Sequence, residues 1–344
     1  MQTKWRSYFS NYGRSDSMDE QNAMVAKKNP FGIPKLQHDG EKWTSDKPTE
    51  GGIDPTKGEL LSFQLANAKL KALRKAAAEE LELPVSRGKI FTLTLPAGWS
   101  CPGANECLAF ADPTSGRVWD SPTLKFRCFA ASAARYENVR NVVWHNFNLQ
   151  RRLKDSHSIA RLILDSLEET MHRFKVKDDD VVIVRIHVGG DFYSLAYLEG
   201  WDIALRTIKA GWHLGRRPHW KFPKTIGYAY TKSLHHLSRM LKDHELSDNF
   251  VITASEGGNY DFGLESKWGN GGTPALKGLK VAKVVGSIEE AESEGLEIDH
   301  DDSHALFGKE SFALLIHGTQ PKGSASAKAL SALRSQGIQS GYAS

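Results

Sequence analysis

The chain has 344 residues, of which 40% are hydrophobic and 25% charged, so it can bury a core in one large domain or two small ones. Its 45 Lys and Arg residues against 41 Asp and Glu permit contact with nucleic acid but do not predict it. No apolar run is long enough to span a bilayer and residues 1–6 hold no apolar signal core, so we expect a cytoplasmic protein without membrane association.

The first segment, residues 1–58, is polar, poor in aliphatic residues and interrupted by Gly and Pro. Its charges nearly balance, so it does not resemble a basic nucleic-acid-binding arm. We expect an extended N-terminal arm with little structure of its own. Residues 59–344 show no internal repeat and no change in composition, which predicts a single further domain.

Strand and helix patterns alternate through this domain. A first helix is predicted over 59–82, where leucines recur at near-helical spacing before Pro84. The predicted strands are 89–95, 181–187, 225–230, 249–254, 280–285 and 311–317. Further helices are predicted over 159–171, 197–209, 233–241, 287–295 and 325–336.

Several of these strands are almost continuously apolar, as strands buried on both faces of a parallel sheet are. Alternation with helices indicates right-handed crossovers and an α/β fold. Six strands are too few for a complete eight-fold barrel and suit either an open barrel or a doubly wound sheet. We favour a parallel-stranded partial (β/α)6 barrel.

The three cysteines of the chain all fall in the predicted loop 96–130, which follows the first strand. Cys101, Cys107 and Cys128 have the spacing Cys-x5-Cys-x20-Cys. Their clustering favours a three-thiolate metal centre with one open coordination position, and iron–sulfur is favoured over zinc. Two other interpretations stay open: small buried hydrophobes without chemistry, and a single nucleophilic cysteine.

Polar and glycine residues gather where the other predicted strands end, the edge at which parallel α/β folds bind ligands. Gly189 and Gly190 are interpreted either as a tight turn or as room for a ligand to approach the backbone. Asp191 is then either a helix cap or an acceptor for a ligand amine. Lys232 is either solvated or a partner for a carboxylate or phosphate. The same pocket is expected to include Tyr228, Tyr230, Ser255, His317 and Gln320.

Two other polar stretches are more readily explained by solvation. The basic run 216–221 contains Trp220 and has the composition of a nucleic-acid-binding loop. The run 299–304 alternates Asp and His, the oxygen and imidazole ligands of a metal site. Both lie between predicted elements, so we expect solvated loops.

Residues 89–320 resemble the phage gene-product-88 family, an uncharacterised group of phage and prophage proteins. The resemblance implies the cytoplasm of an infected or prophage-bearing host. It rests on Cys101-Pro-Gly-Ala, Arg127-Cys-Phe-Ala-Ala with Arg135-Tyr, Arg185-Ile-His with Gly190-Asp-Phe-Tyr-Ser, Tyr228-Ala-Tyr-Thr-Lys-Ser, Ala254-Ser-Glu-Gly-Gly and His317-Gly-Thr-Gln.

The architecture also resembles radical S-adenosylmethionine enzymes, which have a six-fold partial barrel, three cluster cysteines after the first strand and a Gly-Gly-Glu-type motif after the second. Their cysteine spacing is Cys-x3-Cys-x2-Cys, from which this chain departs. The resemblance implies that Cys101, Cys107 and Cys128 hold a 4Fe–4S cluster. It implies that S-adenosylmethionine meets Gly189, Gly190, Asp191 and Ser255, and that Lys232, Tyr230 and His317 serve catalysis.

A competing hypothesis is a non-enzymatic phage protein that binds nucleic acid or a host factor and in which the metal centre only stabilises the fold. A structural zinc ion would need a fourth ligand. His145 is the nearest histidine after Cys128.

Overall fold

The computed structural model describes residues 37–38, 43–44, 59–66, 68–211, 220–264 and 273–338. Of the predicted N-terminal arm, it describes two short strands of two residues each, β1 (Gln37–His38) and β2 (Trp43–Thr44), which pair antiparallel. The rest of the segment 1–58 lies outside the described residues, as do residues 216–219 of the basic run.

Within the described residues, eight strands form one sheet in the order β11-β12-β10-β9-β8-β7-β4-β3. All neighbours pair in parallel except β3 and β4. The strands are β3 (Gln64–Leu65), β4 (Gly88–Thr92), β7 (Val181–Ile186), β8 (Lys224–Thr231), β9 (Phe250–Ser255), β10 (Val281–Val285), β11 (Glu297–Ile298) and β12 (Phe312–Leu315).

The six predicted strands are confirmed as β4, β7, β8, β9, β10 and β12, and they lie side by side in chain order. A doubly wound sheet reverses its strand order at a switch point, and this sheet does not. The doubly wound alternative is therefore wrong. The order is that of consecutive β/α units, and the curvature of a partial barrel stays a prediction.

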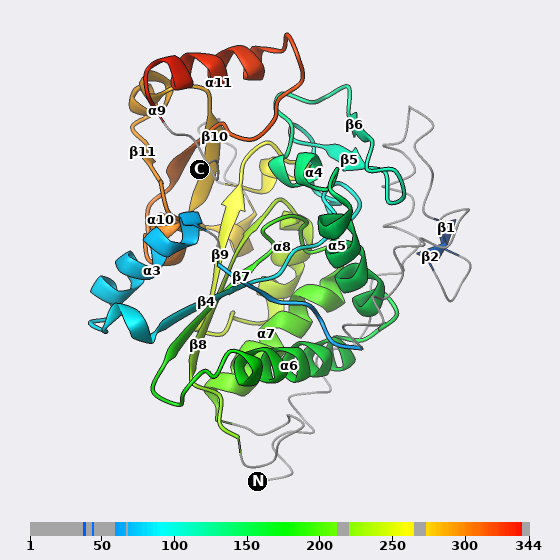
Figure 1. Ribbon diagram of the computed structural model, residues 1–344, viewed down its shortest axis with the longest axis vertical. Coiled ribbons are helices and arrows are strands. Elements are labelled where there is room, and N and C mark those ends of the chain that lie inside the picture. Colours follow the sequence, from blue (N-terminus) through cyan, green and yellow to red (C-terminus); the bar gives the residue numbers. More distant parts are fainter. Residues whose placement is uncertain are drawn as a thin grey trace.

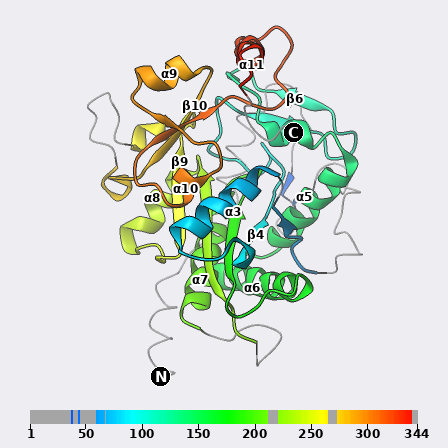
Figure 2. The same ribbon diagram turned by 60° about the vertical axis from the view of Figure 1, so that its left-hand side comes forward.

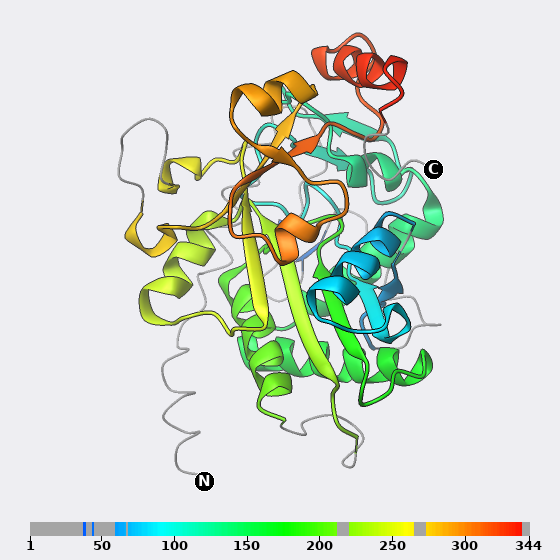
Figure 3. The same cartoon turned by 90° about the vertical axis from the view of Figure 1, so that its left-hand side faces the viewer.

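Helices cover both faces of the sheet (Figures 2 and 3). The larger core packs the side chains of α5, α6, α7 and α8 against one face, and the smaller core packs α3 and α10 against the other. The helices are α3 (Ala68–Glu80), α4 (Phe129–Ala133), α5 (Glu137–Gln150), α6 (Ser156–Arg173), α7 (Leu195–Lys209), α8 (Leu234–Asp243), α9 (Ile288–Ser293), α10 (Ser303–Leu306) and α11 (Ala325–Ser335). No helix of the described segments is both long and apolar enough to cross a membrane.

The prediction of one helix over 59–82 is wrong for its first part. Leu61 and Phe63 are buried and alternate with less buried neighbours, which is the two-residue period of a strand. The Leu61 amide donates to Ser166 of α6, and Gln64 pairs with Thr92 of β4. Tertiary pairing therefore overrides the helical spacing of the leucines.

The cysteine-bearing segment has more structure than the predicted loop. It contains a small antiparallel hairpin, β5 (Ala109–Ala111) and β6 (Val118–Asp120), and the short helix α4 directly after Cys128. Figure 1 shows this segment at the end of the sheet toward which the β9 arrow points. The fold therefore places the cysteines beyond the carboxyl ends of the parallel strands.

Candidate functional site at the carboxyl edge of the sheet

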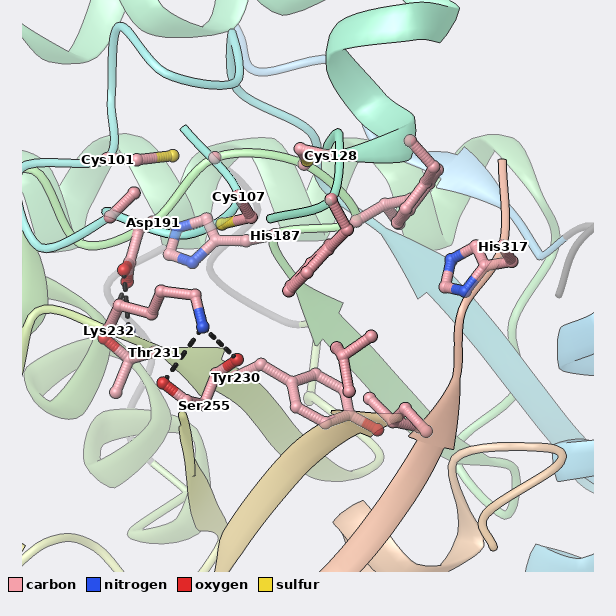
Figure 4. Close-up of a pocket in the computed structure, with 18 of the residues that line it drawn as sticks. Cys101, Cys107, Cys128, His187, Asp191, Tyr230, Thr231, Lys232, Ser255 and His317 are labelled. Carbon is pink, nitrogen blue, oxygen red and sulfur yellow. Dashed lines mark hydrogen bonds between the residues drawn. The ribbon is translucent and has the colours of Figure 1, made fainter. Parts of the chain in front are cut away.

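One cavity at the carboxyl edge of the sheet is lined by ten of the residues that the sequence predicts for the site (Figure 4). Its volume is about 170 Å³, more than ten times the roughly 10–15 Å³ that one water molecule needs on this measure. The cavity can therefore hold a group larger than a single ion. The predicted residues in its lining are Cys101, Cys107, Cys128, Gly189, Gly190, Asp191, Tyr230, Lys232, Ser255 and His317.

Strand alternation explains the side of the cavity that the sheet provides. Successive side chains of a strand point to opposite faces. Tyr230 and Lys232 therefore share one face at the end of β8, and Arg185 of β7 lies on the same face. His187 follows β7 with a left-handed backbone, so alternation does not place its ring, which contacts Phe192 and Tyr197. All four residues line the cavity, and Ser255 joins them from the end of β9.

The first two cysteines reach the cavity because their loop docks directly onto the strand ends. The Asn259 amide donates to the Gly103 carbonyl, and the Glu106 amide donates to the Gly257 carbonyl. A Cβ on Gly103 would lie 2.0 Å from the Lys232 carbonyl oxygen, so only glycine allows this contact. The glycine of the Cys-Pro-Gly stretch thus fixes the loop against β8.

The three thiols lie close enough to affect one another. Burial raises the pKa of Cys101 well above its ordinary value, and the charges of Asp191, Cys128 and Cys107 raise it further. Burial, followed by the charge of Cys107, raises the pKa of Cys128 to about 11. Burial also raises the pKa of Cys107, and the positive charge of Lys232 opposes this rise. Without a cationic partner, these groups are therefore neutral thiols at pH 7.

Asp191 makes three hydrogen bonds to the protein itself. Its Oδ1 accepts from the Phe192 amide at 2.7 Å and from the Thr231 hydroxyl at 2.6 Å. Its Oδ2 accepts from the Lys232 amide at 2.8 Å. Burial raises the pKa of Asp191 to about 6, and these hydrogen bonds oppose the rise. The carboxylate ties the β7–α7 turn to the end of β8, and its role toward a ligand amine stays a prediction.

Gly189 and Gly190 face the cavity but are also packed tightly against the chain itself. A Cβ on Gly189 would lie 2.4 Å from the Ala130 Cβ of α4. Gly190 has a φ of +93°, and a Cβ there would lie 2.5 Å from the Leu95 Cβ. The pair is thus required for close packing beside the cysteine-bearing segment, and approach of a ligand to its backbone stays a prediction.

The Lys232 ammonium is held over the end of β9. It donates to the Ser255 hydroxyl at 2.8 Å, to the Ser255 carbonyl at 3.1 Å and to the Glu256 carbonyl. The residue is 7% exposed, so its interpretation as a solvated lysine is wrong. Its positive charge acts on Cys107 and Cys128 and favours their thiolate forms.

A buried ion pair supports the cavity below Tyr230. Arg185 and Asp302 are joined at 2.7 Å, and Asp302 also accepts from the Tyr228 and Tyr230 hydroxyls at 2.8 and 3.3 Å. Asp302 is 1% exposed and Asp299 is 4% exposed. The expectation that the run 299–304 is solvated is therefore wrong for these two aspartates.

On the opposite side of the cavity, the His317 ring packs at a tilt against Phe129, with ring centroids 4.9 Å apart. Gln320 accepts from the Arg127 amide and donates to the His317 and Arg127 carbonyls. Gln320 and Tyr228 support lining residues but are not among them, so their predicted place in the lining is wrong.

His187 is a residue of the cavity that the sequence analysis did not nominate. It lies at the end of β7, is 4% exposed and has a φ of +67°, which is uncommon for a residue other than glycine. Its position between the apolar run 181–186 and Val188-Gly189-Gly190 could have identified it, because it follows the carboxyl end of a parallel strand, where ligands bind.

Among the described residues, no group of three or more His, Cys, Asp or Glu side chains is arranged to hold one metal ion. His145 does not line the cavity, and its Nε2 lies 2.8 Å from the Leu60 carbonyl oxygen. The predicted role of His145 as a fourth zinc ligand is therefore wrong. The donors around the cavity are three soft thiols, which suit zinc or iron–sulfur centres.

The fold and the site define an α/β protein with consecutive parallel strands and a thiol-lined cavity at their carboxyl edge. The family model described as Gene product 88 matches residues 60–336, so the chain belongs to the phage gene product 88 family. No curated protein and no solved structure matches it significantly.

Proposed function

We propose that this chain is an iron–sulfur protein in which Cys101, Cys107 and Cys128 hold a 4Fe–4S cluster with one iron open to S-adenosylmethionine. The observation that carries this proposal is the meeting of the three thiols in one cavity at the carboxyl edge of consecutive parallel strands. With it we propose that the sheet curves as a partial (β/α)6 barrel.

The donor set and the space support a cluster more than a single ion. Thiolates are the usual ligands of iron–sulfur clusters. The cavity volume of about 170 Å³ is also larger than an ion requires. These points weaken the alternative of a closed, four-coordinate structural zinc site.

The buried Lys232 ammonium supports the same proposal through its charge. Three thiolates in a buried cavity carry negative charge, which low-dielectric surroundings disfavour unless a cation compensates it. Lys232 is fixed by Ser255 and by the Glu256 carbonyl, so its charge stays beside the thiols. Deprotonation of the thiols on metal binding would thus be easier here than in an apolar cavity.

The other lining residues have proposed roles toward the ligand and substrate. The Gly189-Gly190 backbone and Asp191 would bind the amino-acid part of S-adenosylmethionine, with Ser255 beside it. Tyr230, Lys232 and His317 face the cavity from separate positions and would orient the substrate and exchange protons with it. When bound, the cluster supplies the electron that cleaves S-adenosylmethionine and starts radical chemistry.

The proposal predicts about four irons per chain in protein purified without oxygen. Replacing Cys101, Cys107 or Cys128 with Ser should remove most of the iron and the brown colour, because a hydroxyl is a harder and poorer ligand than a thiolate. The matched control is Val284→Ala, which also shortens a side chain of the same cavity but removes no donor. Iron analysis and absorption spectra measure the result.

Zinc at one ion per chain, with no iron after anaerobic reconstitution, would reject the cluster. The cofactor proposal is tested separately by titrating cluster-loaded protein with S-adenosylmethionine and following the electron paramagnetic resonance spectrum. Absence of binding at millimolar ligand would leave the cluster in place but reject S-adenosylmethionine as its partner.

A further inference from the structure

The side chain of His187 offers a polar atom to the cavity that the protein does not use. Its Nε2 lies 3.0 Å from the Tyr197 hydroxyl, whereas its buried Nδ1 has no hydrogen-bond partner among the described residues. Figure 4 shows the ring between Cys107 and Asp191 and above Lys232, at the edge of the cavity. Buried polar atoms are rarely left without a partner, so Nδ1 indicates a ligand.

The Tyr197 hydroxyl and the Lys232 ammonium together favour a ring proton on Nδ1. Burial lowers the pKa of His187 to about 3, so the ring is neutral and carries one proton. The Tyr197 hydroxyl can donate to Nε2 across their 3.0 Å contact. The buried Lys232 charge favours a ligand that accepts hydrogen bonds, and with Nε2 facing Tyr197 the ring donates to such a ligand from Nδ1.

The backbone of His187 is held in an unfavourable conformation. A left-handed φ of +67° is strained in a residue that has a Cβ. The β4–β7 ladder fixes it, because the Val188 amide donates to the Leu93 carbonyl and the Leu95 amide donates to the Gly189 carbonyl. Such strained residues cluster at ligand-binding sites, and this one turns an N–H donor toward the cavity.

We propose that the His187 Nδ1–H, with the Lys232 ammonium on the same side of the cavity, forms an anion-binding subsite. The anion is a carboxylate of the ligand or a sulfur of the thiolate centre, since both accept hydrogen bonds and carry negative charge. The identity of the anion rests on the proposed function, whereas the donor itself does not. His187 is thus a binding residue of this cavity.

The tautomer is tested first in full-length protein without any cofactor. Long-range ¹H–¹⁵N spectra of histidine-labelled protein should show His187 as the Nδ1–H tautomer, and the signal is assigned by its loss in His187→Gln or His187→Asn. Tyr197→Phe, which removes the proton donated to Nε2, should produce a mixture of tautomers. Formate, a small carboxylate, should shift the Nδ1–H resonance. An Nε2–H tautomer in the wild-type protein, or no response to formate, overturns the subsite.

The anion is then identified in cluster-loaded protein with two matched variants. The amide nitrogen of Asn replaces Nδ1, and Asn tolerates the left-handed conformation, whereas the amide nitrogen of Gln replaces Nε2. If the acceptor is a cluster sulfur, only His187→Gln should lower the reduction potential. If it is the ligand carboxylate, only His187→Gln should weaken S-adenosylmethionine binding, by about ten-fold. No difference between Gln and Asn in both readouts overturns the subsite, while absence of iron from the wild-type protein rejects only the cluster.

Discussion

The Asp191 carboxylate joins the carboxyl ends of two neighbouring strands through three accepted hydrogen bonds. It follows the Gly189-Gly190 turn after β7 and accepts from Thr231 and Lys232 at the end of β8. The carboxyl edge of the sheet therefore depends on this residue whether or not a ligand also binds it. Loss of function in an Asp191 variant is informative only if its stability is measured too.

We expect Asp191→Ala to lower the free energy of unfolding by about 2–4 kcal/mol, because it leaves buried donors on Phe192, Thr231 and Lys232 without their acceptor. Urea denaturation measures the change. Asp178→Ala, at an exposed position, is the control and should stay within about 0.5 kcal/mol of the wild type. Equal stabilities of the two variants would show that the three hydrogen bonds contribute nothing.

At the scale of elements, the contact between α6 and α7 places a carboxyl group in a partly buried position. Glu199 of α7 lies beside Ser156 at the start of α6, and burial raises the pKa of Glu199 to about 7 from its ordinary value of 4.5. The Ser156 hydrogen bond opposes this rise, and the charge of Asp202 adds to it. The folded protein therefore holds a proton on Glu199 that the unfolded chain releases at lower pH.

The sign of the pH dependence follows from this raised pKa. The contribution of protonated Glu199 to the stability of the folded protein is complete below pH 4.5 and is lost as the pH rises through about 7. Glu199→Gln keeps a neutral group at every pH, so its free energy of unfolding should rise relative to that of the wild type from pH 5 to pH 8. We expect this difference to increase by about 1–2 kcal/mol after solvent screening, as measured by urea denaturation. The same substitution at exposed Glu292 is the control, and a gap independent of pH would contradict the prediction.

The elements differ in how far the sequence could predict them. Strand β12 is a continuous apolar run and β7 is one except for Arg185, so periodicity and length identified them and their parallel pairing. The hairpin β5–β6 is three residues per strand and lies inside a loop that docks through glycine and backbone contacts. These contacts join residues far apart in the chain, and no local pattern records them.

The site was predictable to the extent that strand ends define it. Ten of the nominated residues do line one cavity, because parallel strands end at a common edge. The support beneath them was not predictable: Asp302 lies in a polar run that is typical of a solvated loop, yet it is buried against Arg185. Only the tertiary fold places Asp302 next to Arg185 of β7.

At the scale of the whole molecule, the Arg185–Asp302 pair connects the two halves of the sheet. Arg185 belongs to β7, near the beginning of the parallel series, and Asp302 precedes α10, between β11 and β12 at its end. Both side chains are almost fully buried, at 6% and 1% exposed. The pair therefore fixes the position of the last strands against the cavity formed by the first ones.

We expect Asp302→Asn to lower the free energy of unfolding by about 3–5 kcal/mol, because Asn tolerates the φ of +70° but leaves the Arg185 charge buried without a countercharge. The double variant Arg185→Met with Asp302→Asn should lose less than the sum of the two single variants, since it removes both charges. Urea denaturation of the four proteins gives the coupling energy. Asp165→Asn, which breaks the Arg161–Asp165 pair on α6, is the matched control and should cost about 0.5 kcal/mol or less. Strictly additive effects of the Arg185 and Asp302 substitutions would show that the pair does not couple the two halves of the sheet.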